Sequence, residues 1–518
     1  MKAISPRFAF FLMRISRWVQ KVPGVRRLVS TIVIEVLART TKPRPRAFSM
    51  AGEYTTWQGL TNRRYTGRHL PPAVGPSAPV RPSEEEVLEL FRRVGEGKRD
   101  PDTSVLFVFF AQWFTDSFLR TDWFDKRKNT STHEIDFCQI YGLSEEKAKL
   151  LRKGKATESQ GGLLASQIIN GEEFPPFFFT RLEDGSVAVA PEYAGLHAPE
   201  IVNVVFADLS DEAKLNVFAS GLEHGNSVIG NVLYNTLFLR EHNRIAKLLA
   251  AENPDWDDDR LFETARNVMI VLLLKIVIED YIVHIGPYDF PLETVPFIAE
   301  GKVWNKSNWI SIEFALLYRW HQLVPNQIIA KGRTLEPTQF RNNNGLVLSE
   351  GVGPLIDLLS RAPAGKIGLH NTPLFLLNSI EKRTIALMRT ANLASFNDYR
   401  EAFSLPRMTS FEQLTSDKAI QAELTRLYGT IDKLEWYVGI FAEDYPDFLM
   451  MGPLLSIMVA YDAFTQALTN PLLARNIYNE DTFSKVGLKV IEETKCLTDI
   501  VARNAGKDFR ALFSIPKD

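Results

Sequence analysis

The sequence has little cysteine and no clustering of the residues that commonly hold metal ions. Two of its 518 residues are cysteine, which is too few for the multi-bridge disulfide framework of small secreted domains. These two, Cys138 and Cys496, also lack the Cys and His spacing of a zinc or iron–sulfur site. The histidines are too scattered for a local metal motif of the HExxH kind. A reducing, intracellular compartment fits this cysteine content best.

A large net charge and long apolar runs are missing as well. The formal net charge is −2, so no overall electrostatic field favours nucleic acid as a partner. The apolar runs near the N-terminus, at 8–13 and 28–37, fall short of the roughly 20 residues that a helix needs to span a bilayer. Since 45% of the residues are hydrophobic, the chain is instead able to bury a large core.

The first 48 residues carry a strong excess of positive charge, with eleven Lys or Arg and one acid, Glu35. Pro23 and Gly24 divide this segment into two short helices. Arginines such as Arg26 would face anionic headgroups, while apolar residues such as Ile32 enter the acyl boundary. We expect residues 1–48 to form a basic amphipathic arm that attaches peripherally, as a monotopic element, to a membrane surface. A secretory signal or a helix that binds another protein is the alternative.

The remainder of the chain predicts helices behind a proline-rich linker. Prolines at 43–45 and within LPPAVGPSAPVRP predict an extended linker over 49–82. Ser83 followed by three Glu is typical of a helix N-cap with an acidic first turn. Apolar residues at helical spacing predict helices at 104–120, 212–250, 260–285 and 308–322, and strand patterns are few and short. We therefore expect a mostly α-helical domain over 83–518.

The segment 316–326, LLYRWHQLVPN, holds Tyr318 and His321 three residues apart. In a helix this spacing puts both side chains on one face, close enough to act on a shared group. If that group is a haem, His321 is able to ligate its iron and Tyr318 to serve as a neighbouring redox residue. Taken alone, the same spacing also fits two packed and hydrogen-bonded core residues.

Four segments in order along the chain resemble the animal haem peroxidase superfamily in its cyclooxygenase branch. The YRWH motif is also similar to that of fungal linoleate dioxygenases, and YR-x-H to that of plant α-dioxygenases, which oxygenate fatty acids. The resemblance covers about residues 54–518 and implies a multi-helix, haem peroxidase-like catalytic domain that binds haem b. The segments are FVFFAQWFTDSFLRTD at 107–122, LFLREHNRIAKLLAAENPDWDDDRLFETAR at 237–266 with KIVIEDYIVHIGPYDF at 275–290, IEFALLYRWHQLVPN at 312–326, and SFNDYREAFSLPRMTSFEQLT with LYGTIDKLEWYVGIFAED within 395–444.

On the haem side, the resemblance implies a role for each of four residues. His321 matches the axial ligand of the haem iron, and Tyr318 matches the tyrosine whose radical removes a hydrogen from the substrate. Trp320, between them, is expected to contact the cofactor. Gln112 matches the glutamine on the distal side of the haem, where it would contact both the cofactor and the peroxide.

On the substrate side, the resemblance implies three further residues. Tyr288 matches the tyrosine near the substrate carboxylate at the channel mouth. Arg39 is the nearest basic residue to the place of its arginine partner, although Lys42 and Arg44 fit equally well on charge. Ala463 falls where cyclooxygenases carry a serine, and a serine seven residues earlier matches only if a gap is moved.

The distal segment departs from the family pattern at Asp116, which stands where the family has a histidine. A distal histidine, with an ordinary pKa of about 6.5, takes a proton from the peroxide and returns it as the O–O bond breaks. An aspartate, with an ordinary pKa of about 3.9, is a base but a poor acid at neutral pH unless burial raises that pKa. Either Asp116 does this work less well, or peroxide cleavage is lost and the haem supports a different oxidation.

These observations lead to one main expectation and two alternatives. The main expectation is a haem-dependent oxygenase of fatty acids or related lipids, in which a Tyr318 radical abstracts hydrogen and O2 then adds. The same-class alternative is desaturation or hydroxylation of a lipid without dioxygen insertion. The other alternative is a degenerate haem-binding protein that has no catalytic turnover. A homodimer is implied by the resemblance alone, and the EGF-like module of cyclooxygenases is missing.

Overall fold

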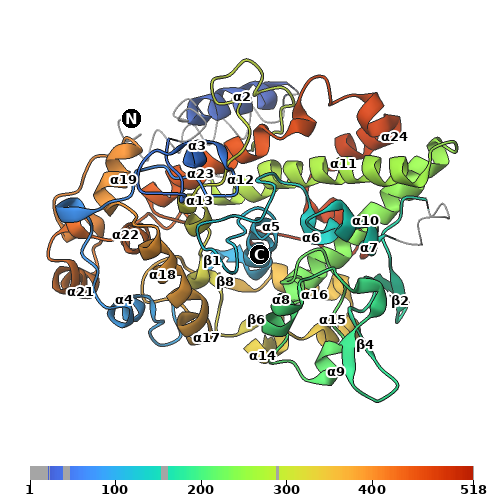
Figure 1. The fold of residues 1–518 in the computed structure, drawn as a ribbon, viewed down its shortest axis with the longest axis horizontal. Coiled ribbons are helices and arrows are strands. Elements are labelled where there is room, and N and C mark those ends of the chain that lie inside the picture. Colours follow the sequence, from blue (N-terminus) through green and yellow to red (C-terminus); the bar gives the residue numbers. More distant parts are fainter. Residues whose placement is uncertain (1–21, 23, 39–46, 153–160, 287–290, 517–518) are drawn as a thin grey trace.

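The computed structural model describes residues 22, 24–38, 47–152, 161–286 and 291–516. Within these residues the chain is mostly helical, as expected, and its strands are short. Three of its helices pack together, because α10 contacts both α5 and α11. They are α5 (Val105–Thr115), α10 (Ile229–Glu252) and α11 (Asp258–Ile276) (Figure 1).

The other elements surround these three helices (Figure 1). The remaining α-helices are α2 (Val25–Ala38), α3 (Trp57–Thr61), α4 (Glu84–Phe91), α6 (Cys138–Tyr141), α7 (Glu145–Leu151), α8 (Pro199–Val205), α9 (Asp211–Lys214), α12 (Ile282–Ile285), α13 (Ile312–Leu317), α14 (Pro337–Phe340), α15 (Asn344–Glu350), α16 (Val352–Ser360), α17 (Leu374–Leu376), α18 (Lys382–Thr390), α19 (Phe396–Ala402), α20 (Phe411–Leu414), α21 (Lys418–Tyr428), α22 (Trp436–Ala442), α23 (Pro453–Leu468), α24 (Glu480–Glu493) and α25 (Leu497–Asn504).

The strands of the described residues form four antiparallel pairs. A 3-10 turn, η5 (His321–Leu323), and two π-helical turns, η3 (Val277–Tyr281) and η6 (Leu377–Glu381), interrupt the helices near the centre of the molecule. The strand pairs are β1 (Arg99–Ser104) with β8 (Pro363–Gly365), β2 (Gln167–Ile169) with β3 (Glu172–Phe174), β4 (Phe179–Arg181) with β5 (Val187–Val189), and β6 (Ile328–Ala330) with β7 (Arg333–Leu335).

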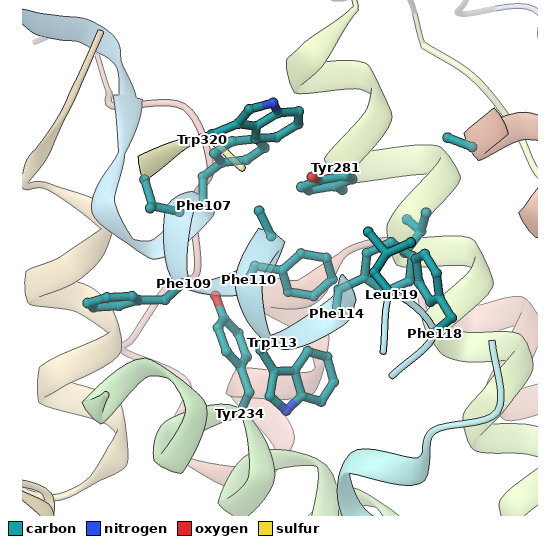
Figure 2. Close-up of a cluster of buried hydrophobic side chains, with 14 of the residues drawn as sticks. Phe107, Phe109, Phe110, Trp113, Phe114, Phe118, Leu119, Tyr234, Tyr281 and Trp320 are labelled. Atoms are coloured by element: carbon teal, nitrogen blue, oxygen red, sulfur yellow. The ribbon is translucent and has the colours of Figure 1, made fainter. Parts of the chain in front are cut away.

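The aromatic side chains of α5 form the centre of the core. Its N-cap, Ser104, accepts a hydrogen bond from the Phe107 amide, and every residue of the helix except Gln112 is buried. The Trp113 ring stacks on Phe238 of α10 with centroids 5.0 Å apart. The Phe107 ring stacks on Tyr281 at the same centroid distance, and Figure 2 shows both side chains in this cluster. Such aromatic contacts add stabilisation beyond the apolar area that they bury. This packing fixes the position of α5 against α10 and α11.

Helix boundaries differ from the sequence prediction at several places. The cap at Ser83 is confirmed, because its side chain and that of Glu86 form a reciprocal capping box. The helix expected over 104–120 ends at Thr115, and the one expected over 212–250 is split into α9 and α10. The intervening loop contains Gly221, where a Cβ would lie 2.0 Å from the Cys138 carbonyl oxygen, so the chain passes too close to α6 for a larger residue.

Only the second half of the predicted membrane arm falls within the described residues, as α2. Ser30 and Ile34 are fully buried on the side of α2 that contacts α23, whereas Leu28 and Ile32 are exposed. The expectation that Arg26 faces headgroups is wrong, because its guanidinium donates a 2.6 Å hydrogen bond to the Leu292 carbonyl. Among the described residues, no helix is both long enough and apolar enough to cross a membrane.

The segment 49–82 is extended over most of its length and runs along the helical domain over 83–518. The Gly67 amide donates to the Ile310 carbonyl, and the Ile312 amide donates to the Gly67 carbonyl, each at 2.8 Å. These two bonds anchor the beginning of α13, the helix that leads into the segment with Tyr318. The segment therefore helps to position the candidate site.

The close crossing of α5 and α10 predicts a stability effect at Gly230. A Cβ there would lie 2.3 Å from the Phe109 side chain. We expect Gly230→Ala to lower the free energy of unfolding by about 1–3 kcal/mol, seen as a lower thermal midpoint. Gly345→Ala in α15 is the control, because its new methyl would meet only the flexible end of Asn343, at 3.3 Å. Equal midpoints for the two variants would contradict the crossing.

Candidate active site

The segment with Tyr318 and His321 is a broken helix and not the continuous one that the sequence predicted. Helix α13 ends at Leu317, Tyr318 is its C-cap with φ −93° and ψ 21°, and His321 begins the 3-10 turn η5. The break turns the Trp320 ring into the core, where it is 5% exposed and stacks on Tyr318 with centroids 4.8 Å apart. Pro325 has no amide hydrogen with which to extend an α-helix past His321.

Tyr318 lies in the wall of a narrow, mostly apolar pocket. The pocket has a cavity volume of only about 10 Å³, and Ala463 of α23 lines it together with Tyr318. The structure thus brings together two residues that the sequence placed on the catalytic and the substrate side. The other lining residues come from α5, the η3 and α12 turns, α13 and neighbouring segments: Phe114, Phe118, Ile135, Val277, Ile282, Phe314 and Gln466.

The surroundings of the Tyr318 hydroxyl keep it protonated. Burial raises the pKa of Tyr318 well above its ordinary value, and the charge of Asp462 adds to this rise. The Tyr281 hydroxyl, at the end of the π turn η3, lies close enough to oppose part of this rise in the Tyr318 pKa. The two hydroxyls are nevertheless beyond ordinary hydrogen-bond geometry, and Tyr281 makes no hydrogen bond to any described residue. Tyr318 is therefore a neutral phenol that faces apolar surface.

His321 is oriented by a buried carboxylate. Its Nδ1 lies 2.8 Å from the Glu381 Oε2, and the Glu381 side chain is fully buried. Because a carboxylate oxygen accepts hydrogen bonds, Nδ1 carries the ring hydrogen and Nε2 keeps its lone pair. Nε2 makes no hydrogen bond to any described residue. An imidazole nitrogen held in this way fits an axial ligand of haem iron.

Gln112 and Asp116, which the resemblance predicts on the distal side of a haem, lie on the open side of α5. Gln112 is the one exposed residue of this otherwise buried helix, and Asp116 caps its C-terminus. Asp116 is enclosed by protein on most sides but remains partly accessible to solvent. Burial raises the pKa of its carboxyl group, and the charges of His224, Arg120 and Arg319 oppose the rise. Arg319, in the segment with His321, is thus near enough for its charge to act on Asp116.

A charged cluster beside Asp116 was not found from the sequence. The Arg120 guanidinium donates a 2.8 Å hydrogen bond to Glu223, and Trp123 Nε1 donates to the same oxygen at 3.2 Å. Burial alone would raise the Glu223 pKa, but the charges of Arg120 and His224 hold it at about 2. The His224 ring lies against Trp123 with centroids 5.6 Å apart. These residues fix the charge around the Asp116 carboxylate.

Two predicted residues lie outside the part of the chain that the structure describes, and two residues of the site were not predicted. Tyr288 and Arg39 lie outside the described residues, so their roles stay predictions. Glu381 and Tyr281 were not singled out from the sequence, although Tyr281 lies in the quoted segment KIVIEDYIVHIGPYDF. Glu381 had no sequence signal, because its partner His321 is 60 residues away in the chain. Only the fold brings these two residues together.

Comparisons with known proteins agree with this geometry. The family model described as animal haem peroxidase matches residues 117–512, which begin directly after Asp116. Prostaglandin G/H synthase 2 of Equus caballus is 32% identical over 502 residues, covering 94% of this chain and 78% of the relative. Prostaglandin G/H synthase 1 of Rattus norvegicus is 31% identical over 532 residues, covering 99% and 83%.

Solved structures share the fold at lower identity. Peroxidase A from Dictyostelium discoideum superposes with a TM-score of 0.68 at 18% identity, covering 91% of this chain and 99% of that one. The fatty acid alpha-dioxygenase of Oryza sativa also has a TM-score of 0.68, at 16% identity, covering 98% and 97%. These structures show the shared fold, while the family match and the prostaglandin synthase relatives show the family. The chain belongs to the animal haem peroxidase family, in the cyclooxygenase branch, and is a haem-dependent oxidoreductase.

Proposed function

We propose that this chain is a haem-dependent oxygenase of fatty acids or related lipids, in which Tyr318 carries the radical that attacks the substrate. One observation carries the proposal. The break after α13 leaves Tyr318 in the wall of an apolar pocket, while His321, three residues later, holds its free Nε2 away from Glu381. A redox tyrosine and an iron ligand are thus fixed by one short, buried segment.

The residues on the haem side have separate roles. His321 would hold the iron through Nε2, and Trp320 would contact the cofactor beside it. Haem b, when bound and oxidised by a peroxide, would supply the one-electron oxidation of Tyr318. Because its raised pKa keeps Tyr318 a neutral phenol beforehand, loss of one electron and of the hydroxyl proton gives a neutral tyrosyl radical. The apolar pocket keeps water away from that radical.

The substrate reaction balances without any further reactant than O2. The Tyr318 radical takes a hydrogen atom from an acyl carbon and becomes the phenol again. O2 adds to the carbon radical, and the resulting peroxyl group takes the hydrogen atom back from Tyr318. The product is a lipid hydroperoxide, and the tyrosyl radical is restored. The names of two similar proteins, prostaglandin G/H synthase and fatty acid alpha-dioxygenase, support lipid as the substrate class.

The substrate is proposed to lie along the pocket beside Ala463. Ala463 has a small side chain, and the other lining residues are mostly apolar, which suits the approach of an acyl chain to Tyr318. Tyr288 and Arg39 are proposed to bind the substrate carboxylate at the channel mouth. Gln112 and Asp116 would act on the peroxide, with the Asp116 carboxylate accepting a proton and, because its pKa is raised, returning it.

Attachment to a membrane surface is proposed for the N-terminal arm. Leu28 and Ile32 are exposed on the outer side of α2, at 60% and 54%. Eleven cations within residues 1–48 would be attracted to anionic lipid. Such peripheral attachment would give a water-insoluble substrate a direct path to the pocket. An intracellular location and a homodimer remain expectations.

Replacing Tyr318 tests the radical mechanism. Tyr318→Phe removes only the hydroxyl, so we expect the haem Soret band to stay and O2 uptake with unsaturated fatty acids to be lost. Tyr445→Phe is the control, because the Tyr445 hydroxyl bonds to the Ile367 carbonyl and lies outside the pocket lining. Mass spectrometry of the product then distinguishes a hydroperoxide from a hydroxylated or desaturated lipid. Unchanged uptake by Tyr318→Phe would show that the mechanism is wrong.

The distal assignment of Asp116 predicts a gain of function. In Asp116→His the imidazole both accepts and returns the peroxide proton near neutral pH, so we expect reaction with hydrogen peroxide to accelerate about tenfold or more. Asp116→Asn, which has no base, should react more slowly than the unaltered protein. Stopped-flow absorbance of the haem measures both rates. If neither substitution changes the rate, position 116 does not face the peroxide.

The exposed side of α2 predicts vesicle binding. We expect the double variant Leu28→Ser, Ile32→Ser to bind vesicles of phosphatidylcholine and phosphatidylserine about tenfold more weakly, because it loses apolar area that enters the bilayer. Val94→Ser, at a residue that is 68% exposed, is the matched control and should leave binding unchanged. Co-sedimentation measures the bound fraction, and equal binding by all three proteins would refute the membrane role of α2.

A further inference from the structure

Two π-helical turns lie beside the segment with Tyr318 and His321. One, η3, ends at Tyr281, whose hydroxyl influences the pKa of Tyr318. The other, η6, lies between α17 and α18 and ends at Glu381, which contacts His321. A π turn inserts one residue into a helix and shifts the direction of its side chains, and such turns are frequent at functional sites. The turn η6 is therefore a local device that aims Glu381 at the ring of His321.

Three donors surround the Glu381 carboxylate. The His321 Nδ1–H and the Tyr437 hydroxyl each donate at 2.8 Å, to Oε2 and Oε1 respectively. The Thr372 hydroxyl donates to Oε2 at 3.3 Å. Burial raises the pKa of Tyr437 far above its ordinary value, and the Glu381 charge adds to the rise, so Tyr437 stays a neutral donor. Among the described residues, no Lys or Arg forms an ion pair with Glu381, and its contact with His321 is a hydrogen bond from a neutral imidazole.

Packing alone does not require a charged side chain at Glu381. A carboxylate without solvent contact is costly to bury unless donors compensate it, and a glutamine of the same shape would fill the same space without a charge. The negative charge therefore has its main effect on the group that it contacts most closely, the His321 ring. A carboxylate that accepts the second ring hydrogen of a metal-bound histidine fixes its tautomer and raises its basicity.

We infer that Glu381 is a positioning residue that makes His321 a stronger electron donor and so lowers the reduction potential of the haem iron. The inference rests on the proposed role of His321 as the axial ligand. Tyr437 acts in the opposite sense, because its hydroxyl withdraws charge from Glu381 and weakens the pull on the His321 hydrogen. Together the two residues set the electron density at the ligand, and with it the relative stability of oxidised and reduced iron.

The test is a spectroelectrochemical titration of the haem-loaded protein. Glu381→Gln keeps the shape and an acceptor but removes the charge. We expect it to favour reduction of the iron by about tenfold or more in the equilibrium constant, which is about 59 mV for one electron. Tyr437→Phe should shift the equilibrium the other way, toward oxidised iron. The iron–histidine stretching band of the reduced protein, in resonance Raman spectra, should move to lower frequency in Glu381→Gln and to higher frequency in Tyr437→Phe.

Each outcome of this experiment supports the inference or overturns it. Opposite shifts for the two variants support it, and an unchanged potential in Glu381→Gln overturns it. If Glu381→Gln does not retain haem, Tyr437→Phe decides: a lower potential supports the inference, and an unchanged one overturns it. Failure of the proposed function looks different, because the unaltered protein would then show no Soret band or no iron–histidine band.

Discussion

The break in the chain between Leu317 and His321 is the constraint on which the rest of the site depends. A continuous helix would hold Tyr318 and His321 on one face, with one environment for both. The C-cap at Tyr318 and the 3-10 turn at His321 separate them. Tyr318 faces the apolar pocket with Ala463, and His321 faces the buried Glu381. Trp320, stacked on Tyr318, fills the space between the two environments.

The surrounding elements keep this broken segment in place. Hydrogen bonds with Gly67 anchor the start of α13, and Phe114 of α5 lines the pocket together with Phe118 just beyond that helix. The π turns η3 and η6 supply Tyr281 and Glu381 at the two ends of the segment. On the distal side, the charges around Asp116 oppose the effect of its burial. The proposed proximal side therefore carries a candidate iron ligand and a candidate redox tyrosine, whereas Asp116 on the proposed distal side departs from the family pattern.

The sequence predicted those features that depend on local pattern. The mostly helical fold and the cap at Ser83 follow from helical spacing, capping residues and the resemblance. The helix through His321 was wrong, because packing of the Trp320 ring, a tertiary contact, overrides helical spacing. The contact of Glu381 with His321 was also beyond the sequence, because it depends on a π turn and joins residues that are far apart in the chain.

The central claim is that Tyr318 becomes a radical when haem is bound at His321. Electron paramagnetic resonance tests it most directly, on haem-loaded protein that is mixed with an organic hydroperoxide and frozen. The account predicts a tyrosyl radical signal in the unaltered protein and its loss in Tyr318→Phe, with the haem still bound. The same signal, with the same line shape and intensity, in Tyr318→Phe would contradict the account.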